Sequence, residues 1–512
     1  MTALLTKLKS LPLIFFLIVA IAAFLRFYNL KDSLMFQGDQ GRDALVVSQI
    51  FQELDPVFIG PVTSIGNMYL GPFYYYFMLP FLFLSYPSPM GPVYAVAGLG
   101  LVTVVLFFFI ARRLFDQKTA LIGTFFFGLS AGAVNLSRFS WNPNIAPFFS
   151  LLMFYWTYLA WKKNSKYWIY VAICFALLIQ LHYVTLLAFS GPAIILLLQI
   201  KDYFQAAKNK TDQKIKQLGL HVLFASVIFL ISLTPLVLFD FKHGFVNATS
   251  FTSILTEKES FDLERKTGGN TWQAIHKFLT LDLKDRASQI IFEPSFGVHP
   301  LNHPLLFVLL ITVIIYLVKT KAKLSEAEIV LAAYLIPAII GISVYQHQVY
   351  EHYIAYLFPM VYLLYGLFFS RLKPKFLSFI LFIGFGTFFI TNNLNRYWLK
   401  SHTFTIDNML QTAQAIHNRV SQNEKYNIVL LSESKDLYGM NYRYFLNTLD
   451  NKPVKIEDHH QAQKLFIINE EHSSFDPVSS EIYEIKVFPS KTIVDRFTIE
   501  NGPEIIVLQS YN

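Results

Sequence analysis

The chain has 512 residues, of which 54% are hydrophobic, 17% aromatic and only 15% charged. Since a soluble domain carries about 25% charged residues, this composition excludes an ordinary soluble protein and predicts a polytopic α-helical membrane protein. The net charge of +8 does not indicate nucleic-acid binding, because the basic residues lie in short loops between hydrophobic segments, and the single cysteine, Cys174, excludes an intramolecular disulfide.

The first hydrophobic segment, near residues 11–28, follows Lys7 and Lys9. No convincing small-residue cleavage site comes after it, so we interpret it as a retained transmembrane helix rather than a signal peptide.

An acidic motif comes shortly after that segment and contains Asp39, Arg42 and Asp43. Ionisable groups at a membrane–water boundary are costly and usually mark a functional site. On a helix that begins near Asp39, the two carboxylates share a face, where they can bind a cation or supply a general base. We expect the side chain of Arg42 to point elsewhere and to bind an anion. The alternative interpretation is structural, with Asp39 as a helix N-cap followed by a first-turn acid.

Hydrophobic runs long enough to span a bilayer recur along the chain. They lie near residues 11–28, 91–110, 119–135, 145–161, 219–240, 304–318, 327–345, 353–370 and 376–392. The stretch 167–200 is long enough for two short spans if it turns near His182. Together these runs predict about eleven transmembrane helices within a domain that covers residues 1–399.

The orientation follows from the basic loops, because all of them fall on one side if the chain crosses eleven times. The positive-inside rule then places the N-terminus in the cytoplasm and the C-terminus outside. The apolar run 72–86 is short, is interrupted by Pro80 and would break this pattern as a full crossing. We therefore predict a first external loop, 29–90, with in-plane helices at 44–55 and 72–86. A second large external loop, 241–303, is polar.

Three further groups of polar residues lie on the predicted external side. Arg138 is isolated among apolar residues near Asn142, and its guanidinium suits a phosphate, although snorkelling to lipid headgroups is the alternative. His182 and Tyr183 mark the turn inside 167–200, where a structural histidine is the alternative. The stretch 345–353 holds two histidines, a glutamate and three tyrosines, among them Glu351, His352 and Tyr353. These groups suit a sugar or a phosphate, and a hydrated loop with interfacial tyrosines is the alternative.

Residues 400–512 differ in composition and predict a small external α/β domain. The strand-like runs are 427–431, 464–468, 482–488 and 504–508, and helical patterns lie at about 407–420 and 436–449. No P-loop, HExxH, CxxC or GxSxG motif occurs in the chain.

The layout resembles the GT-C superfamily of membrane glycosyltransferases, and within it the family 39, protein O-mannosyltransferase-like group that includes lipid A aminoarabinose transferases. The matching residues are Gly38–Asp43, Gly71–Tyr76, Ser137-Arg138, and His352-Tyr353 with Pro359, and the resemblance covers roughly residues 1–400.

This resemblance implies a plasma-membrane, multi-pass glycosyltransferase that moves a hexosyl or pentosyl unit from a polyprenyl-phosphate donor to a glycan, lipid or protein acceptor on the external face. By analogy Asp39 is the catalytic acid/base and Asp43 its catalytic support, and Arg138 neutralises the phosphate. The remaining substrate-binding candidates are Arg42, Tyr74, Asn142, His182, Tyr183, Glu351, His352 and Tyr353.

The chain departs from its relatives at two places. Gln40 follows Asp39 where many relatives have an acid, and Asn142 and Asn144 stand where oligosaccharyltransferases carry an acidic pair. Amides are poorer ligands than carboxylates for a hard cation, so no cofactor is predicted with certainty and a divalent cation stays open.

Two other functions compete with an enzyme. A transporter or flippase for a lipid-linked glycan should carry polar residues through its helix midplanes, whereas this sequence gathers them at one surface. A membrane scaffold whose external domain binds a partner is the other alternative. Membrane lipids are expected partners in every case, and nucleic acid is not.

Overall fold

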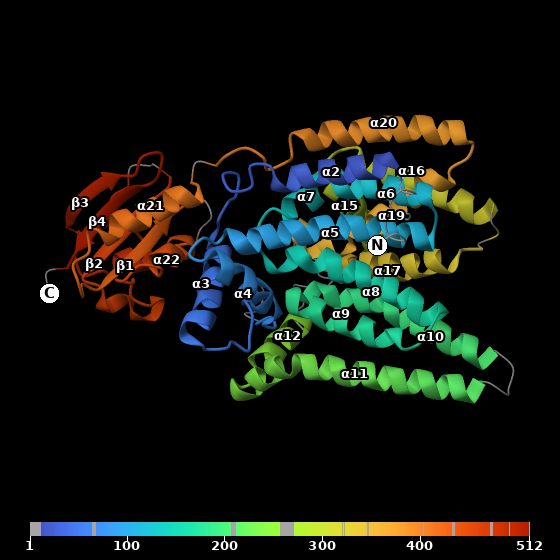
Figure 1. Ribbon diagram of the computed structural model, residues 1–512, viewed down its shortest axis with the longest axis horizontal. Coiled ribbons are helices and arrows are strands. Elements are labelled where there is room, and N and C mark those ends of the chain that lie inside the picture. The colour runs from blue at the N-terminus through green and yellow to red at the C-terminus, as the bar shows by residue number, and fades with distance from the viewer. Residues whose placement is uncertain are drawn as a thin grey trace, which may run out of the picture.

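The computed structural model describes residues 12–63, 68–205, 211–256, 271–319, 321, 323–345, 348–402, 404–432, 436–471, 475–490 and 492–510. A bundle of long, roughly aligned helices forms most of the molecule, and a small sheet with its own helices lies beyond one end of the bundle (Figure 1).

Every predicted span coincides with one helix or with two or three consecutive helical segments. The helices of the bundle are α2 (Leu13–Phe27), α5 (Met90–Leu114), α6 (Gln117–Leu129), α7 (Ala131–Leu136), η1 (Asn142–Ile145), α8 (Ala146–Lys162), α9 (Tyr167–Leu181), η2 (Tyr183–Phe189), α10 (Ser190–Gln205), α11 (Thr211–Lys242), α16 (Asn302–Lys319), α17 (Glu326–Val344), α18 (Glu351–Ile354), η5 (Ala355–Leu357), α19 (Phe358–Arg371) and α20 (Lys375–Leu394). The predicted turn in 167–200 is confirmed, because the extended backbone of His182 ends α9.

Seven helical segments in the described part of the chain are long and apolar enough to cross a membrane. Three shorter apolar helices, α2, α9 and Phe73–Ser85, accompany them. The structure is therefore that of a polytopic membrane protein, and the number of eleven crossings stays a prediction.

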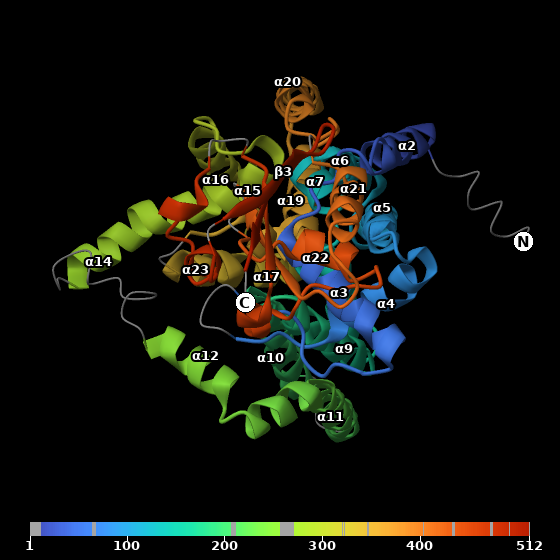
Figure 2. The ribbon, with the colours of Figure 1, turned by 90° about the vertical axis from the view of Figure 1, so that its left-hand side faces the viewer.

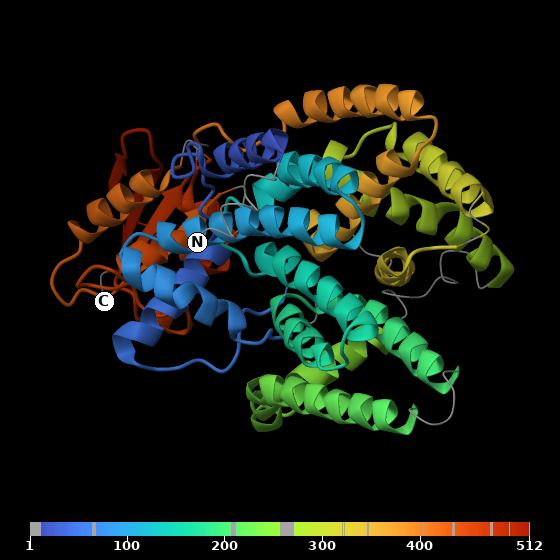
Figure 3. The ribbon, with the colours of Figure 1, turned by 45° about the vertical axis from the view of Figure 1, so that its right-hand side comes forward.

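The first loop forms the two helices that the sequence predicts, α3 (Gly38–Glu53) and α4 (Phe73–Ser85). They pack on each other at the end of the bundle nearest the sheet (Figures 1 and 3). Helix α3 begins six residues before the predicted 44–55, with Gln37 as its N-cap. As a result the acidic motif lies in the first two turns of α3, and Asp39 does not cap the helix.

The second loop is largely helical where the structure describes it. It contains α12 (Val246–Thr256), α14 (Thr271–Lys277), η4 (Phe278–Asp282) and α15 (Leu283–Phe296), and residues 257–270 lie outside the described residues.

The C-terminal unit contains a four-stranded sheet in the order β1-β2-β4-β3. Strand β1 (Tyr426–Leu431) runs parallel to β2 (Lys464–Asn469), whereas β4 (Glu504–Gln509) is antiparallel to β2 and to β3 (Ile493–Thr498). The helices of this unit are α21 (Ile406–His417), α22 (Met440–Leu446), η6 (Ile456–Gln461), η7 (Pro477–Ser479) and α23 (Tyr483–Lys486).

Three of the four predicted strands are confirmed, and the fourth prediction is wrong. Residues 482–488 contain the helical turn α23, because Ile485 and Phe488 are three residues apart and together cover one face of the sheet beside Leu465 and Ile506. The strand β3 was not predicted, since its residues are mostly exposed and include Asp495 and Arg496. An edge strand of this kind lacks a buried apolar face.

The C-terminal unit packs directly on the acidic helix. Helix α22 contacts α3, and the two lie side by side in Figure 2 as well as in Figure 1. A methyl group on Gly41 would overlap the backbone of Met440 and Asn441, so glycine permits this close approach. The ring of Phe36 packs against Tyr444 and Phe445 in the same interface. The position of α3 is therefore fixed from both the bundle and the sheet.

Candidate active site

A cavity of about 720 Å³ lies where the acidic helix meets the bundle. We call it the main cavity. Its lining residues come from α3, the segments 61–63 and 68–70, the turn before α8, the α9–η2 junction, α12 and the segment from the end of α17 to α18. They are Asp39, Arg42, Pro61, Val62, Thr63, Met68, Leu70, Trp141, Asn142, Pro143, His182, Tyr183, Val184, Leu186, Leu187, Phe251, Gly341, Ile342, Tyr345, Val349, Tyr350, His352 and Tyr353.

The acidic motif forms a bridged pair of carboxylates. The Nη1 atom of Arg42 donates to Oδ1 of Asp39 at 2.7 Å, and its Nε and Nη2 atoms donate to Oδ1 of Asp43 at 3.0 and 2.8 Å. The prediction that Arg42 points elsewhere is therefore wrong. Residues three apart are neighbours on a helix surface, and the long side chain reaches both acids.

The two carboxylates have different surroundings. The side chain of Asp39 is 51% exposed and lines the main cavity, whereas that of Asp43 is 0% exposed and does not line it. The hydroxyl of Tyr75 donates to Oδ1 of Asp43 at 3.3 Å, and Oδ2 of Asp43 has no hydrogen-bond partner among the described residues. Asp43 therefore does not itself line the cavity, and Arg42 connects it to Asp39.

Burial and the ion pairs of the bridge have opposite effects on the pKa values of Asp43 and Arg42. Burial raises the pKa of Asp43 to about 6, although the guanidinium of Arg42 opposes that rise. Burial lowers the pKa of Arg42, but Asp43 and Asp39 outweigh it and raise that pKa above its ordinary value. Arg42 therefore stays charged, and the pKa of Asp43 lies in the mildly acidic range.

Four aromatic rings line another part of the main cavity. Trp141 lies 4.4 Å from the ring of His352, and His182 lies 4.6 Å from the ring of Tyr353, between ring centres. The backbone N–H of Val184 donates to Nδ1 of His182 at 3.2 Å. This bond fixes the neutral tautomer that carries its proton on Nε2, so His182 offers a hydrogen-bond donor.

Two predicted residues hold the cavity walls together. The hydroxyl of Tyr183 donates to the carbonyl of Tyr69 at 2.5 Å and ties the segment 68–70 to η2. The side-chain amide of Asn142 donates to the carbonyl of Leu181 at 2.5 Å and joins the start of η1 to the end of α9.

Tyr74, Arg138 and Glu351 do not line the main cavity. Tyr74 is fully buried and its hydroxyl pairs with Oγ of Ser140 at 2.7 Å. The carboxylate of Glu351 packs beside Gly132 and lies 4.0 Å from Arg396. His347 of the same stretch lies outside the described residues.

Arg138 is 3% exposed, and its guanidinium is engaged by the protein itself. Nη1 donates to the carbonyl of Leu25 at 2.6 Å, and Nη2 donates to the carbonyl of Tyr28 at 2.9 Å and to Oγ of Ser33 at 2.5 Å. The structure thus gives Arg138 a role in holding the end of α2 and the turn that follows it. Arg42 is the only Lys or Arg among the described residues of the cavity wall.

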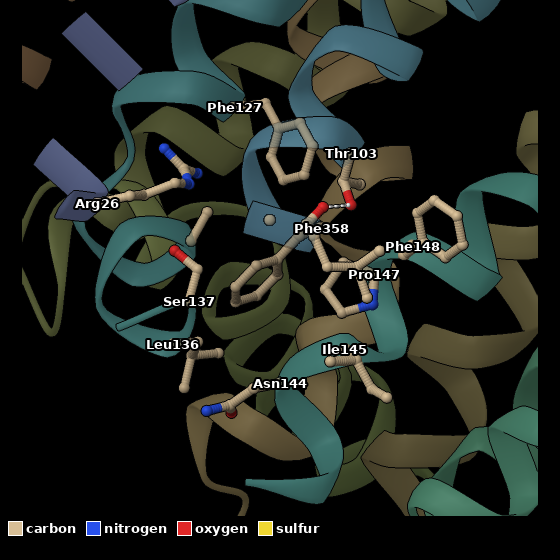
Figure 4. Close-up of a pocket in the computed structure, with 13 residues that line it drawn as sticks. Arg26, Thr103, Phe127, Leu136, Ser137, Asn144, Ile145, Pro147, Phe148 and Phe358 are labelled. Carbon is tan, nitrogen blue, oxygen red and sulfur yellow. Dashed lines mark hydrogen bonds between the residues drawn. The ribbon is translucent and has the colours of Figure 1, made fainter. Parts of the chain in front are cut away.

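A second, much smaller cavity of about 20 Å³ is lined by Arg26, Ser137 and Phe358 among others (Figure 4). Arg26 is 1% exposed and donates to the carbonyls of Ala22 and Gly128. This space can hold a water molecule but not a sugar. It is therefore not the substrate site.

No group of three or more His, Cys, Asp or Glu residues that could hold a metal ion occurs in the described ranges. The predicted candidate for a cation, the pair Asp39 and Asp43, is occupied by the guanidinium of Arg42. These residues do not fit a metal in this arrangement.

Several cavity residues were not predicted. Trp141 is next to Asn142 in the sequence, and Tyr345 and Tyr350 lie in the polar stretch 345–353, so their neighbours could have indicated them. The segments 61–63 and 68–70, Phe251 and Gly341 carry no such signal, because only the tertiary fold brings them to the cavity.

Comparisons with known proteins agree with this architecture. Residues 71–238 match the family model of dolichyl-phosphate-mannose-protein mannosyltransferases. The structure is similar to ArnT from Cupriavidus metallidurans in the apo state (TM-score 0.56, 11% identity, 96% of this chain and 97% of that chain). It is also similar to ArnT from that organism bound to undecaprenyl phosphate (TM-score 0.54, 11% identity, the same coverage). The Archaeoglobus fulgidus oligosaccharyltransferase in complex with Zn and sulfate has a TM-score of 0.49 at 14% identity, over 89% of this chain and 68% of that chain. No curated protein matches the sequence.

The fold is therefore that of the GT-C membrane glycosyltransferases, and the resemblance predicted from the sequence is confirmed. The family model of dolichyl-phosphate-mannose-protein mannosyltransferases adds a sequence match to this likeness of fold, over residues 71–238.

Proposed function

We propose that the protein transfers a sugar from a polyprenyl-phosphate donor to an acceptor hydroxyl, with Asp39 as the catalytic base. One observation carries this proposal: the half-exposed carboxylate of Asp39 faces a cavity of about 720 Å³ while Arg42 and the buried Asp43 hold it in place. A carboxylate must be positioned to accept a proton in the transition state, and a two-point guanidinium bridge supplies that positioning.

The base has one oxygen available for the acceptor. Among the described residues only Oδ1 of Asp39 is bonded, to Arg42. Its Oδ2 atom can accept the proton of the attacking hydroxyl. The acceptor oxygen then bonds to the anomeric carbon, and the bond from that carbon to the phosphate oxygen breaks, with the electron pair leaving on polyprenyl phosphate.

The same bridge serves the leaving group. When Asp39 takes the proton it becomes neutral and no longer balances Arg42. The guanidinium charge is then available to the phosphate at the moment when negative charge develops there. His182 adds a neutral donor through Nε2, and the apolar residues Leu186, Leu187 and Ile342 suit an isoprenoid chain.

The lining of the main cavity favours a single displacement with inversion at the anomeric carbon. A retaining reaction of the double-displacement type uses two carboxylates at the reacting carbon. Asp39 is the only carboxylate in the described lining of the main cavity. The product should accordingly have the anomeric configuration opposite to that of the donor, which NMR of the product measures.

The side of the membrane on which the reaction takes place is inferred from the ends of the helices. Helix α9 runs from just after Lys166 to His182, and α17 runs from just after Lys323 to just before Tyr345. The basic loops therefore lie at the helix ends opposite the cavity. With the positive-inside rule this arrangement supports a plasma-membrane enzyme that acts on the external face, with a cytoplasmic N-terminus and an external C-terminal unit.

The test is sugar transfer by purified protein from a polyprenyl-phosphate sugar to an acceptor. Replacing Asp39 by Asn should lower the rate by about 10²–10⁴-fold, the usual contribution of a general base. The matched control is Asp55→Asn, an exposed acid two residues beyond α3. Asp39→Asn protein that folds normally and transfers sugar as fast as Asp55→Asn rejects the proposal. Lipid movement without any transfer by the wild type would favour the flippase alternative.

A further inference from the structure

A second sizeable cavity lies in the C-terminal unit, away from the acidic helix. Its volume is about 260 Å³, and it shares no lining residue with the main cavity. Asn427 and Leu465, which are paired at the amino ends of the parallel strands β1 and β2, form its floor. The helix η6 supplies His459 and His460, and the α23 segment supplies Tyr483 and Glu484.

The polar wall of this cavity offers hydrogen-bond acceptors. The Oε2 atom of Glu484 is buried and has no hydrogen-bond partner among the described residues. The Nδ1 atom of His459 lies 3.2 Å from the carbonyl of Ile456, so in the neutral ring Nδ1 carries the proton and Nε2 is an acceptor. A buried acceptor without a donor is costly, and a ligand that supplies donors removes that cost.

Positive charge does not face the cavity. Arg443 does not line the cavity, is 4% exposed, and donates to the carbonyls of Tyr438 and Val454 and to the side-chain oxygen of Asn427. The described lining contains neither Lys nor Arg. A phosphate or a carboxylate would therefore meet the carboxylate of Glu484 without a compensating cation, so anionic ligands are disfavoured.

The other side of the cavity is apolar and aromatic. Tyr483 is 61% exposed and its ring lies 5.7 Å from that of His459, between ring centres. Phe488 and Val487 continue this surface. Aromatic rings beside hydrogen-bond acceptors match a pyranose, which has an apolar C–H face and donor hydroxyls at its rim. A metal does not fit, because no group of three or more metal-binding side chains exists in the described part of the chain.

From these observations we propose that the C-terminal cavity binds one hydroxyl-rich sugar unit of a glycan. The choice of a sugar among donor-rich ligands rests on the proposed function. The site would hold the acceptor glycan outside the main cavity, with Glu484 accepting from ring hydroxyls and Tyr483 packing on the ring. Glycans with such a unit would bind more tightly than single acceptor sugars, since two linked contacts raise the effective concentration of the second.

The experiment uses the full chain in lipid nanodiscs without a polyprenyl-phosphate sugar donor, so that no turnover interferes. The probes are methyl α-mannoside, methyl β-glucoside and methyl β-galactoside, measured by saturation-transfer difference NMR. We expect saturable binding of at least one probe, and a loss of affinity of about tenfold in Glu484→Gln, because a charged acceptor bonds roughly twice as strongly as a neutral one. Tyr483→Ala should weaken binding to a similar extent.

The matched control is Glu481→Gln, an 85% exposed acid that pairs with Lys486 outside the cavity and should bind like the parent. Binding of none of the three probes overturns the proposal, as does equal binding by Glu484→Gln and Glu481→Gln. Saturable binding of spermidine, with none of the sugars, also overturns it and identifies an amine site. Because binding is measured without transfer, these outcomes are independent of whether Asp39 proves to be the base.

Discussion

The start of α3 and the turn after α7 each place one arginine near the same end of the bundle, but the two arginines have opposite surroundings. Arg42 bridges two carboxylates at the wall of the main cavity. Arg138 is buried and bonds two backbone carbonyls and one hydroxyl. The two arginines thus differ in the partners of the guanidinium, which are carboxylates at a cavity wall for Arg42 and mainly backbone carbonyls for Arg138. Lysine substitutions test this difference directly.

Arg42→Lys should reduce transfer strongly. An ammonium keeps the charge but lacks the planar fork that reaches Asp39 and Asp43 together, so the base loses its fixed orientation. We expect a loss of about 10²-fold in kcat/KM, the size of effect that misplacing a reacting group by about 1 Å produces. Transfer kinetics measure the loss, and the unfolding temperature shows whether the fold is retained. A variant with full activity would show that the bridge does not position the base.

Arg138→Lys should reduce stability instead. Lysine cannot satisfy the carbonyls of Leu25 and Tyr28 with the hydroxyl of Ser33 in the same geometry. A buried acceptor left unpaired costs about 1–3 kcal/mol, so thermal unfolding should occur at a lower temperature. Transfer per folded molecule should change little. A large drop in kcat at unchanged stability would return Arg138 to the phosphate role.

The pH dependence should follow Asp43. Burial raises the pKa of this carboxyl to about 6. Below that pH Asp43 is protonated and its hold on Arg42 weakens, so transfer should fall as the pH drops through about 6. In Asp43→Asn the transfer rate should no longer fall at acidic pH. Its pH-independent value should be lower than in the wild type. A pH–rate profile of both proteins, with the intrinsic titration of the acceptor measured separately, checks the assignment. An unchanged fall at acidic pH in the variant contradicts it.

The raised pKa of Asp43 also predicts how the stability of the fold depends on pH. Because the pKa of Asp43 is higher in the folded protein than its ordinary value of 3.8, its ionisation opposes folding. The stability that the protonated form provides is present below about pH 4 and is lost as the pH rises through about 6. Asp43→Asn should therefore gain stability relative to the wild type on going from pH 4 to pH 7.

A substitution at the contact between α22 and α3 should have the smallest effect on transfer. In Gly41→Ala the new methyl group meets the backbone of Met440 and Asn441, so α3 must shift. Overpacking of this kind costs about 1–3 kcal/mol, and we expect a loss of transfer of only a few-fold. The control is Gly384→Ala in α20, where nothing lies within 4 Å of the added methyl. Equal stability and activity of the two variants would show that α22 does not hold α3.

Most of the fold was predictable, because hydrophobic runs and the short polar breaks between them define a helical membrane protein directly. The pairing of Asp39 with Asp43 on one face was also predictable from the helical repeat. The bridging by Arg42 is a matter of side-chain conformation, which periodicity does not determine. Residues 482–488 show the same limit, because an alternating pattern of seven residues fits a strand and a helical turn almost equally well.

The role of Arg138 could not be predicted for a different reason. Its isolation from acidic residues in the sequence is real, but its partners are backbone carbonyls more than a hundred residues away. Backbone acceptors have no signature in a sequence. The bond from the hydroxyl of Tyr183 to the backbone carbonyl of Tyr69 has no signature in the sequence for the same reason.

The most direct test compares Asp39→Asn with Asp43→Asn in the same transfer assay. The two substitutions each remove one charge from the same bridge, but only Asp39 reaches the main cavity. Transfer should be lost by about 10²–10⁴-fold in Asp39→Asn and should remain clearly measurable in Asp43→Asn, with both proteins folded. The reverse order, with Asp43→Asn inactive and Asp39→Asn active, would contradict the assignment of Asp39 as the base.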